Sequence, residues 1–322
     1  MYLRLLKSIE ENKIYGTLII LLLYFFSSFS QQGIKVKNLK INNKLNHFAP
    51  VMSKGKVYFS RNKLNSKGKP IKTRFGGYMY SLLKANVDTQ GEISNAEPIT
   101  KKDLSFFNVS AATFSKGGKY MYFTTNSEFV GKNSRQDFNA HHLQIKRAEY
   151  VKGKGWTNVT DLPFTNNEYS FAHPALSPDN STLYFVSNIP GTKGRTDIYK
   201  VSVANHSSYG DIERLSDSIN SPRTELFPFV AQDNKLYFSS NRRDGIGGYD
   251  IYGYNIETND LSEKPKILPE PINSIGEDFS FYLMDDGRSG FFTSRRTDGK
   301  GDDDIYYFTG FRSSKPVLNL AD

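Results

Sequence analysis

Cysteine is absent from the 322 residues and tryptophan occurs once. The absence of cysteine excludes disulfide bonds, a thiolate zinc site, a cysteine nucleophile and the lipidated cysteine of a bacterial lipoprotein. Phosphate-binding loops and the Gly-x-Ser-x-Gly and His-Glu-x-x-His motifs are also missing. None of the five histidines has a partner at metal-ligand spacing. The sequence therefore predicts a protein that is not an enzyme and that carries no metal or cofactor.

The first thirty residues differ in character from the rest of the chain. Three cationic residues precede an apolar run from Leu18 to Phe26, and the small residues Ser28 and Ser30 follow it. The run is shorter than the ~20 residues that span a bilayer, as is typical of a signal peptide. We expect residues 1–30 to be a signal peptide and residues 31–322 to form one exported domain, periplasmic or associated with the outer membrane, with no transmembrane span after cleavage. An uncleaved N-terminal anchor is the alternative.

Positive charge is concentrated in one part of the chain. Residues 31–100 contain thirteen Lys or Arg against three Asp or Glu, whereas residues 101–322 carry 26 against 28. Such a local surplus attracts an acidic protein face, an anionic glycan or lipid headgroups. A solvated face that only maintains solubility is the alternative. Nucleic acid is not an expected partner of an exported chain. The candidate binding residues in this region are Lys63, Lys67, Lys69 and Lys72.

An aromatic pair recurs along the chain and divides it into repeats. The chain is rich in Phe, with 24, and Tyr, with 20, which favours short strands over helices. Five apolar runs centred on the pair follow one another at spacings of 64, 62, 53 and 54 residues, which is the signature of a repeat architecture. The pairs are Tyr58-Phe59, Tyr122-Phe123, Tyr184-Phe185, Tyr237-Phe238 and Phe291-Phe292.

Each repeat has the pattern of a four-stranded propeller blade. A hairpin carries the aromatic pair on its second strand, an Asp-Ile-Tyr phrase forms a third strand, and Leu215–Asn220 or Leu268–Asn273 forms a fourth. A stray fourth-strand phrase, Asn38–Asn43, precedes the first repeat, and the last repeat lacks one. The predicted fold is therefore an all-β, five-bladed β-propeller of four-stranded antiparallel blades, closed by an N-terminal strand that completes the last blade.

The loop between the second and third strands repeats a Gly three residues before an Asp. We expect the Gly to adopt a positive φ and the Asp to accept backbone N–H groups, which makes this a structural loop. A calcium site is the alternative, but the spacing fits no EF-hand loop. The pairs are Gly194 with Asp197, Gly247 with Asp250, and Gly301 with Asp304.

Four arginines and one tyrosine at the start of these loops are candidate ligand contacts. Guanidinium forks suit carboxylate or sulfate groups, and an exposed tyrosine suits a sugar ring. Ion pairs with neighbouring carboxylates are the alternative. His173, on an innermost strand, is expected to line the channel or to be a buried histidine with a satisfied hydrogen bond. The binding candidates are Arg242, Arg243, Tyr249, Arg295 and Arg296.

Three phrases resemble the WD-repeat-like periplasmic β-propeller family found in Bacteroidetes OmpA-type envelope proteins, some linked to type IX secretion and gliding. They are Ala172–Asp179, Ser239–Tyr252 and Phe292–Tyr306. The resemblance implies a rigid scaffold that docks protein partners in the cell envelope. Blades 1 and 2 depart from the pattern, with Tyr78–Tyr80 and Leu143–Ile145 in place of Asp-Ile-Tyr.

The resulting functional hypothesis is a non-catalytic envelope propeller that binds a protein partner through its irregular, basic first blade. Two alternatives stay open. One is a protein that binds a glycan or a peptidoglycan fragment through aromatics and arginines at the channel mouth. The other is a five-bladed glycan-processing hydrolase, which requires two or three carboxylates to converge on the channel. The available carboxylates are Asp179, Glu225, Glu277 and Asp278.

Overall fold

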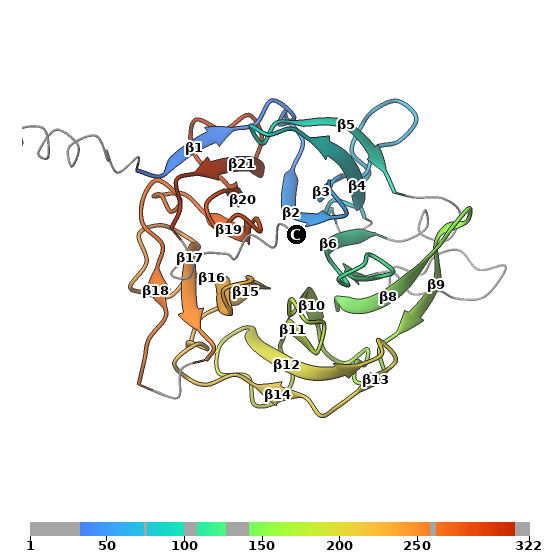
Figure 1. Ribbon diagram of the computed structural model, residues 1–322, viewed down its shortest axis with the longest axis vertical. Coiled ribbons are helices and arrows are strands. Elements are labelled where there is room, and N and C mark those ends of the chain that lie inside the picture. Colours follow the sequence, from blue (N-terminus) through green and yellow to red (C-terminus); the bar gives the residue numbers. More distant parts are fainter. Residues whose placement is uncertain (1–32, 74–75, 100–107, 127–141, 258–261, 313–322) are drawn as a thin grey trace, which may run out of the picture. The chain divides into compact units, whose positions relative to one another are not determined.

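Five antiparallel sheets surround a central axis, which confirms the predicted five-bladed propeller (Figure 1). The computed structural model describes residues 33–73, 76–99, 108–126, 142–257 and 262–312, so the predicted signal peptide lies outside the described residues. Blade 1 contains β2 (His47–Ser53), β3 (Lys56–Asn62), β4 (Tyr80–Val87) and β5 (Ile93–Pro98); blade 2 contains β6 (Val109–Phe114), β7 (Tyr120–Thr125), β8 (Gln144–Val151) and β9 (Gly155–Asp161).

The other three blades repeat this order from the axis outward. Blade 3 carries one strand beyond the common four. It contains β10 (Phe171–Leu176), β11 (Thr182–Ser187), β12 (Asp197–Ala204), β13 (Ser208–Tyr209) and β14 (Glu213–Arg214); blade 4 contains β15 (Glu225–Val230), β16 (Lys235–Ser240), β17 (Asp250–Asn255) and β18 (Lys266–Ile267); blade 5 contains β19 (Asp278–Leu283), β20 (Gly290–Ser294), β21 (Asp304–Thr309) and β1 (Lys35–Asn38).

The N-terminal strand closes the ring, as predicted. Strand β1 pairs antiparallel with β21, with Lys35 opposite Thr309. Further along, the Asn42 side chain accepts a bond from the Ile305 N–H (3.0 Å) and donates to the Ile305 carbonyl (2.7 Å). Asn220 and Asn273 make the same pair of bonds to Ile198 and Ile251. The N-terminal segment therefore occupies the position that the end of the repeat occupies in blades 3 and 4.

The predicted bounds of the fourth strand were wrong in blades 3, 4 and 5. In blade 5 this strand is β1, which ends at Asn38, so most of the predicted phrase Asn38–Asn43 lies beyond it. Strands β14 and β18 are only two residues long and end before Leu215 and Leu268. The phrases that follow are turns, in which Asn220 and Asn273 replace ladder hydrogen bonds by side-chain bonds to Ile198 and Ile251 of the third strand. The pattern of polar residues after a single Leu signalled this turn, not a strand.

The second strand of each blade is buried on both faces because it lies between two neighbouring blades. Phe59, Phe123, Phe185, Phe238 and Phe292 are at most 1% exposed. Successive aromatic side chains point into different neighbours: Tyr58 joins a cluster with blade 2, whereas Phe59 joins one with blade 5. The aromatic pair that revealed the repeat is thus the packing contact between blades.

A bulge with positive φ recurs on every innermost strand. The φ angles lie between 36° and 53°, which is a strained region for residues other than glycine. At several seams the bulged N–H donates to a hydroxyl on the second strand of the preceding blade, for example from Ala111 to Ser60 and from His173 to Thr124. These bonds stitch blades together at the axis. The bulged residues are Ala49, Ala111, His173, Phe227 and Ser280.

Candidate functional site

The repeated Gly-x-x-Asp loop has a structural geometry. The buried Asp197 and Asp250 carboxylates accept N–H bonds from the loop, including those of Gly194 (3.1 Å) and Gly247 (3.0 Å). The Gly301 N–H makes the same bond to Asp304 (3.1 Å). The carboxylates of these three aspartates therefore serve to hydrogen-bond the N–H groups of their own loops.

The predicted reason for these glycines was wrong. Gly194, Gly247 and Gly301 do not have a positive φ. A Cβ on any of them would instead clash with a carbonyl oxygen of the linker that leads to the next blade, at Arg223, Gly276 and Asn43. The glycines are required because two backbones approach closely at the seam.

Arg242 and Arg296 form ion pairs at the seams, which is the alternative to a ligand contact given in the sequence analysis. Arg242 reaches the buried Glu225 carboxylate (3.6 Å) and lies over the Phe238 and Tyr252 rings, with 4.8 Å to the Tyr252 centroid. Burial raises the pKa of Glu225, while its bonds from two serines and the nearby Arg242 oppose this. Arg296 repeats the arrangement with Asp278 (3.1 Å).

The remaining three candidates, Arg295, Arg243 and Tyr249, differ in exposure and in whether they form ion pairs. Arg295 forms ion pairs with Asp303 (2.5 Å) and Glu277 (2.6 Å). Arg243 is exposed, whereas Tyr249 is half-buried and not exposed as expected. The structure therefore does not bring the five candidates into one site.

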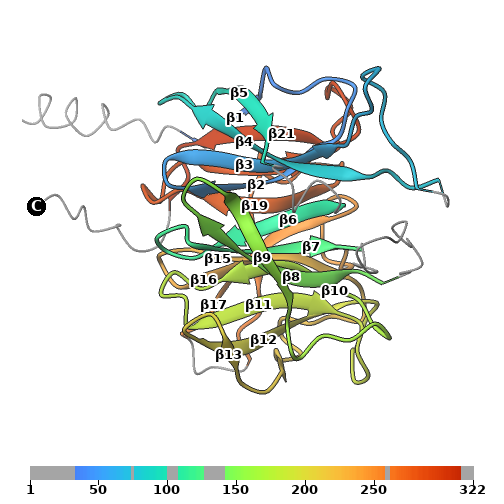
Figure 2. The same ribbon diagram turned by 90° about the vertical axis from the view of Figure 1, so that its right-hand side faces the viewer.

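The predicted basic region is an arm between β3 and β4 that projects past the ends of the strands (Figure 2). The arm, defined as residues 61–80, contains six Lys or Arg and no Asp or Glu. Backbone bonds order it, from Lys63 N–H to the Met79 carbonyl (2.7 Å) and from Ile71 N–H to the Lys63 carbonyl (2.8 Å). Lys67, Lys69 and Lys72 are exposed and Lys63 is half-buried.

The channel itself is narrow and apolar at its middle. A cavity of about 50 Å³ is lined by the bulged residues. His173 stacks on Phe227 with ring centroids 3.7 Å apart, and its Nδ1 accepts a bond from the Phe227 N–H (3.3 Å). Burial lowers the His173 pKa to about 3, so the ring is neutral. His173 therefore lines the channel, and it is half-buried with a satisfied hydrogen bond.

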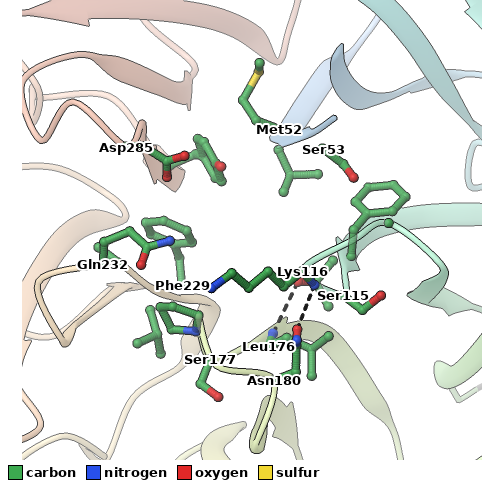
Figure 3. A pocket seen from close by; sticks show the side chains of 18 of the residues that line it. Met52, Ser53, Ser115, Lys116, Leu176, Ser177, Asn180, Phe229, Gln232 and Asp285 are labelled. Atoms are coloured by element: carbon green, nitrogen blue, oxygen red, sulfur yellow. Dashed lines mark hydrogen bonds between the residues drawn. The ribbon is translucent and has the colours of Figure 1, made fainter. Parts of the chain in front are cut away.

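A wider pocket opens where the hairpins of all five blades converge on the axis (Figure 3). This axial pocket has a volume of about 290 Å³. Its floor is apolar and includes Phe229, which packs on Tyr282 (4.8 Å between centroids). The Lys116 side chain extends across the pocket towards Phe229 and Gln232, and the Lys116 N–H donates to Asn180 (2.9 Å).

An outer groove of about 510 Å³ continues from the axial pocket between blades 1 and 2. Ser53, Lys54 and Gly118 line both. Phe114 of the axial pocket packs on two outer-groove rings, Tyr58 (4.3 Å) and Trp156 (5.6 Å).

At the outer end of the groove, Tyr150 is 46% exposed and meets Trp156 edge-on at 5.5 Å. We call the axial pocket and outer groove together the trough. The trough was not predicted from the sequence, although the single tryptophan, Trp156, lines it.

Carboxylates are sparse along the trough. Asp285 is the one acidic residue lining the axial pocket, and Glu97, paired with Lys84 (3.3 Å), is the one lining the outer groove. The four carboxylates proposed for a glycosidase do not line the described part of the channel or the axial pocket. Glu225 and Asp278 form the seam ion pairs described above, and Glu277 pairs with Arg295. Asp179 accepts hydrogen bonds from Ser177 and Ser181.

Within the described ranges, no three His, Asp or Glu side chains gather in a way that would hold a metal ion. No helix in those ranges is long and apolar enough to cross a membrane.

Solved structures that are similar to this chain share 14% or less of its sequence in the three cases described below. An endo-arabinase from Bacteroides thetaiotaomicron is 14% identical, covers 87% of this chain and 98% of its own, and has a TM-score of 0.49. A protein of unknown function from Dyadobacter fermentans is 10% identical over 86% and 99%, with a TM-score of 0.47. A Mycobacterium tuberculosis puromycin-hydrolyzing peptidase is 14% identical, with a TM-score of 0.45; 81% of this chain matches 45% of the peptidase, so this chain spans less than half of it. No family model and no curated protein matches the chain.

The endo-arabinase and the peptidase are both enzymes, and the prediction that this chain is not an enzyme is contradicted by these similar structures. We do not retain that prediction. With TM-scores below 0.5, the likeness carries no argument for a particular activity. Any activity must therefore be argued from the chain's own residues.

Proposed function

We propose that this propeller binds an oligosaccharide along the trough. The observation that carries the proposal is the continuity of the axial pocket and the outer groove, which share Ser53, Lys54 and Gly118. A long, open site of this kind suits a chain of sugar rings better than a single compact ligand.

The chemistry of the lining also fits a sugar. The Asn180 and Gln232 side chains lie around an apolar floor, and amide groups beside apolar surface match the hydroxyl-rich edges and apolar faces of sugar rings. Lys116 has no ion pair among the described residues, so its ammonium is available to a hydroxyl or an acidic sugar.

Tyr150 and Trp156 provide the ring platform at the outer end. If a sugar covers ~50 Å² of the Tyr150 ring at ~25 cal/mol per Å², the contact is worth about 1.3 kcal/mol, or roughly tenfold in affinity. We therefore expect Tyr150→Ala to weaken binding about tenfold. Tyr78 is the matched control because it is another exposed tyrosine, at 37%, and lies on the arm.

The single tryptophan makes the experiment direct, since all tryptophan fluorescence reports on the trough. Neutral and acidic oligosaccharides of four to six units are titrated into the wild type, Tyr150→Ala and Tyr78→Ala. Because one similar structure is an endo-arabinase, the same incubations are analysed for shortened products. Saturable quenching that Tyr150→Ala weakens and Tyr78→Ala preserves is expected. Quenching that is unaffected by Tyr150→Ala contradicts the proposed site.

The acid-free arm favours a second function, the docking of an acidic protein partner in the cell envelope. This is the role implied by the resemblance to the WD-repeat-like periplasmic propellers, and it includes export to the periplasm or outer membrane, in connection with type IX secretion or gliding. Reversal of Lys67, Lys69 and Lys72 to Glu is expected to abolish partner capture by in-cell crosslinking. Reversal of the exposed Lys264 and Lys266 is the matched control; equal capture by both variants contradicts docking on the arm.

A further inference from the structure

Blade 1 lacks the two carboxylates that blades 4 and 5 carry at one position of the strand register. In blade 4, Ser240 lies between Glu225 on β15 and Asp250 on β17 in the strand register. In blade 5, Ser294 lies between Asp278 and Asp304 in the same way. Two buried acidic side chains therefore flank a small hydroxyl at this position.

Blade 1 carries a cation at the same register position. Arg61 on β3 is flanked by His47 on β2 and Ser81 on β4. The register also corrects the sequence analysis, because Ser81 and not Tyr78–Tyr80 replaces the third-strand Asp. Compared with blades 4 and 5, blade 1 therefore has two fewer acidic residues and one additional guanidinium at this register position.

The guanidinium of Arg61 has no counter-ion in the described chain. Its Nε is buried without a hydrogen-bond partner, and no ion pair involves it. Burial alone lowers its pKa, with no carboxylate acting on it. Asp303, a carboxyl at this seam, is already bound by Asn46 (2.8 Å) and Arg295 (2.5 Å).

His47 does not repel or neutralise an incoming anion. Burial lowers its pKa to about 4, and its Nδ1 bonds the Leu45 carbonyl (2.8 Å), so the ring is neutral at physiological pH. A half-buried, unpaired guanidinium beside a neutral ring is costly in free energy until an anion satisfies it.

We propose that Arg61 forms a carboxylate-binding site at the closing seam of the ring, in which a carboxylate from outside the chain takes the place of the acidic side chain that blades 4 and 5 supply internally. The two-pronged guanidinium matches a carboxylate in geometry. The site lies at the base of the acid-free arm, so the carboxylate comes either from a small organic acid or from an acidic peptide held along the arm. This inference is independent of saccharide binding in the trough.

Two variants test the site in different ways. His47→Asp returns a carboxylate to the register position that Glu225 and Asp278 occupy, so we expect it to fold, to pair with Arg61 and to exclude the ligand. Arg61→Gln removes the binding group. Arg223→Gln is the matched control because Arg223 is an exposed arginine in the linker between blades 3 and 4, outside the seam between blades 5 and 1.

The probes are sodium succinate and a fluorescein-labelled hexaglutamate peptide, at constant ionic strength. Succinate is followed by calorimetry and hexaglutamate by anisotropy. We expect the wild type and Arg223→Gln to bind, and His47→Asp and Arg61→Gln to bind at least tenfold more weakly. Binding of both probes identifies a small acid as sufficient; binding of hexaglutamate alone identifies the peptide as the source.

Two results would overturn the site. The first is a wild type that binds neither probe. The second is binding by His47→Asp and Arg61→Gln equal to that of the wild type. If in the second case the Lys67, Lys69 and Lys72 reversal still abolishes hexaglutamate binding, docking on the arm stands and the Arg61 site alone fails.

Discussion

His173 allows a sharp test of how the blades are joined at the axis. At three other seams, a hydroxyl on the second strand accepts the bulged N–H of the next blade; the acceptors are Ser60, Thr124 and Thr293. In blade 3 the equivalent residue is Val186, which has no acceptor. The His173 ring takes over the role and accepts the Phe227 N–H.

Replacing His173 by Ala therefore leaves a buried N–H unsatisfied and removes a ring stack. The unpaired N–H costs ~1–3 kcal/mol and the lost stack ~0.5–1.5 kcal/mol, about 3 kcal/mol together. Adding Val186→Thr to this variant supplies the missing hydroxyl at nearly unchanged volume. We expect the double variant to regain about 1–2 kcal/mol of unfolding free energy.

The assay is urea unfolding at pH 7.5, followed by circular dichroism, for the wild type, both single variants and the double variant. Because Val186 and His173 would act on one N–H, the two effects must be non-additive in this cycle. Additive effects, with the double variant no more stable than His173→Ala, would refute the idea that His173 substitutes for a hydroxyl.

Three further predictions concern pH and the seams. The pKa of His173 is about 3 in the folded chain against 6.5 in the unfolded chain, so the unfolded chain binds a proton first as the pH falls below 6.5. The free energy of unfolding should therefore fall by roughly 2 kcal/mol between pH 6.5 and pH 5. Urea melts of His173→Ala should lack this loss. Gly247→Ala forces a Cβ against the Gly276 carbonyl and should lower the melting temperature, whereas Gly77→Ala, which has an ordinary 3.6 Å contact, should not. Asn42→Leu removes both side-chain bonds to Ile305 and should destabilise the chain by about 2–4 kcal/mol in urea melts.

The architecture was readable from the sequence because each blade repeats the same aromatic pair and the same loop. Spacing alone identified the blade number and the closing strand. The seam pairs were also within reach, since Arg242 follows Glu225 by 17 residues and Arg296 follows Asp278 by 18. The arginines were taken as ligand candidates because the sequence does not show which side chains of a blade meet in the folded chain.

The trough was out of reach for a different reason. Lys54 and Trp156 are a hundred residues apart and belong to different blades, so no local pattern joins them. The role of Gly247 was misjudged on similar grounds, because the contact that excludes a Cβ comes from Gly276 in the following linker. Repeat patterns report what blades share, whereas the binding sites that we propose lie where blades differ.

Closure by β1 also has a consequence for the order of folding. The closing bonds join residues that are about 260 positions apart, as between Asn42 and Ile305, so they cannot form before the last blade exists. During synthesis, the first blades must wait with an unpaired strand and an open seam, which exposes edges prone to association. The final blade therefore acts as the committing step for the whole ring, and a chain stopped short of it should fail as a unit, not lose one blade.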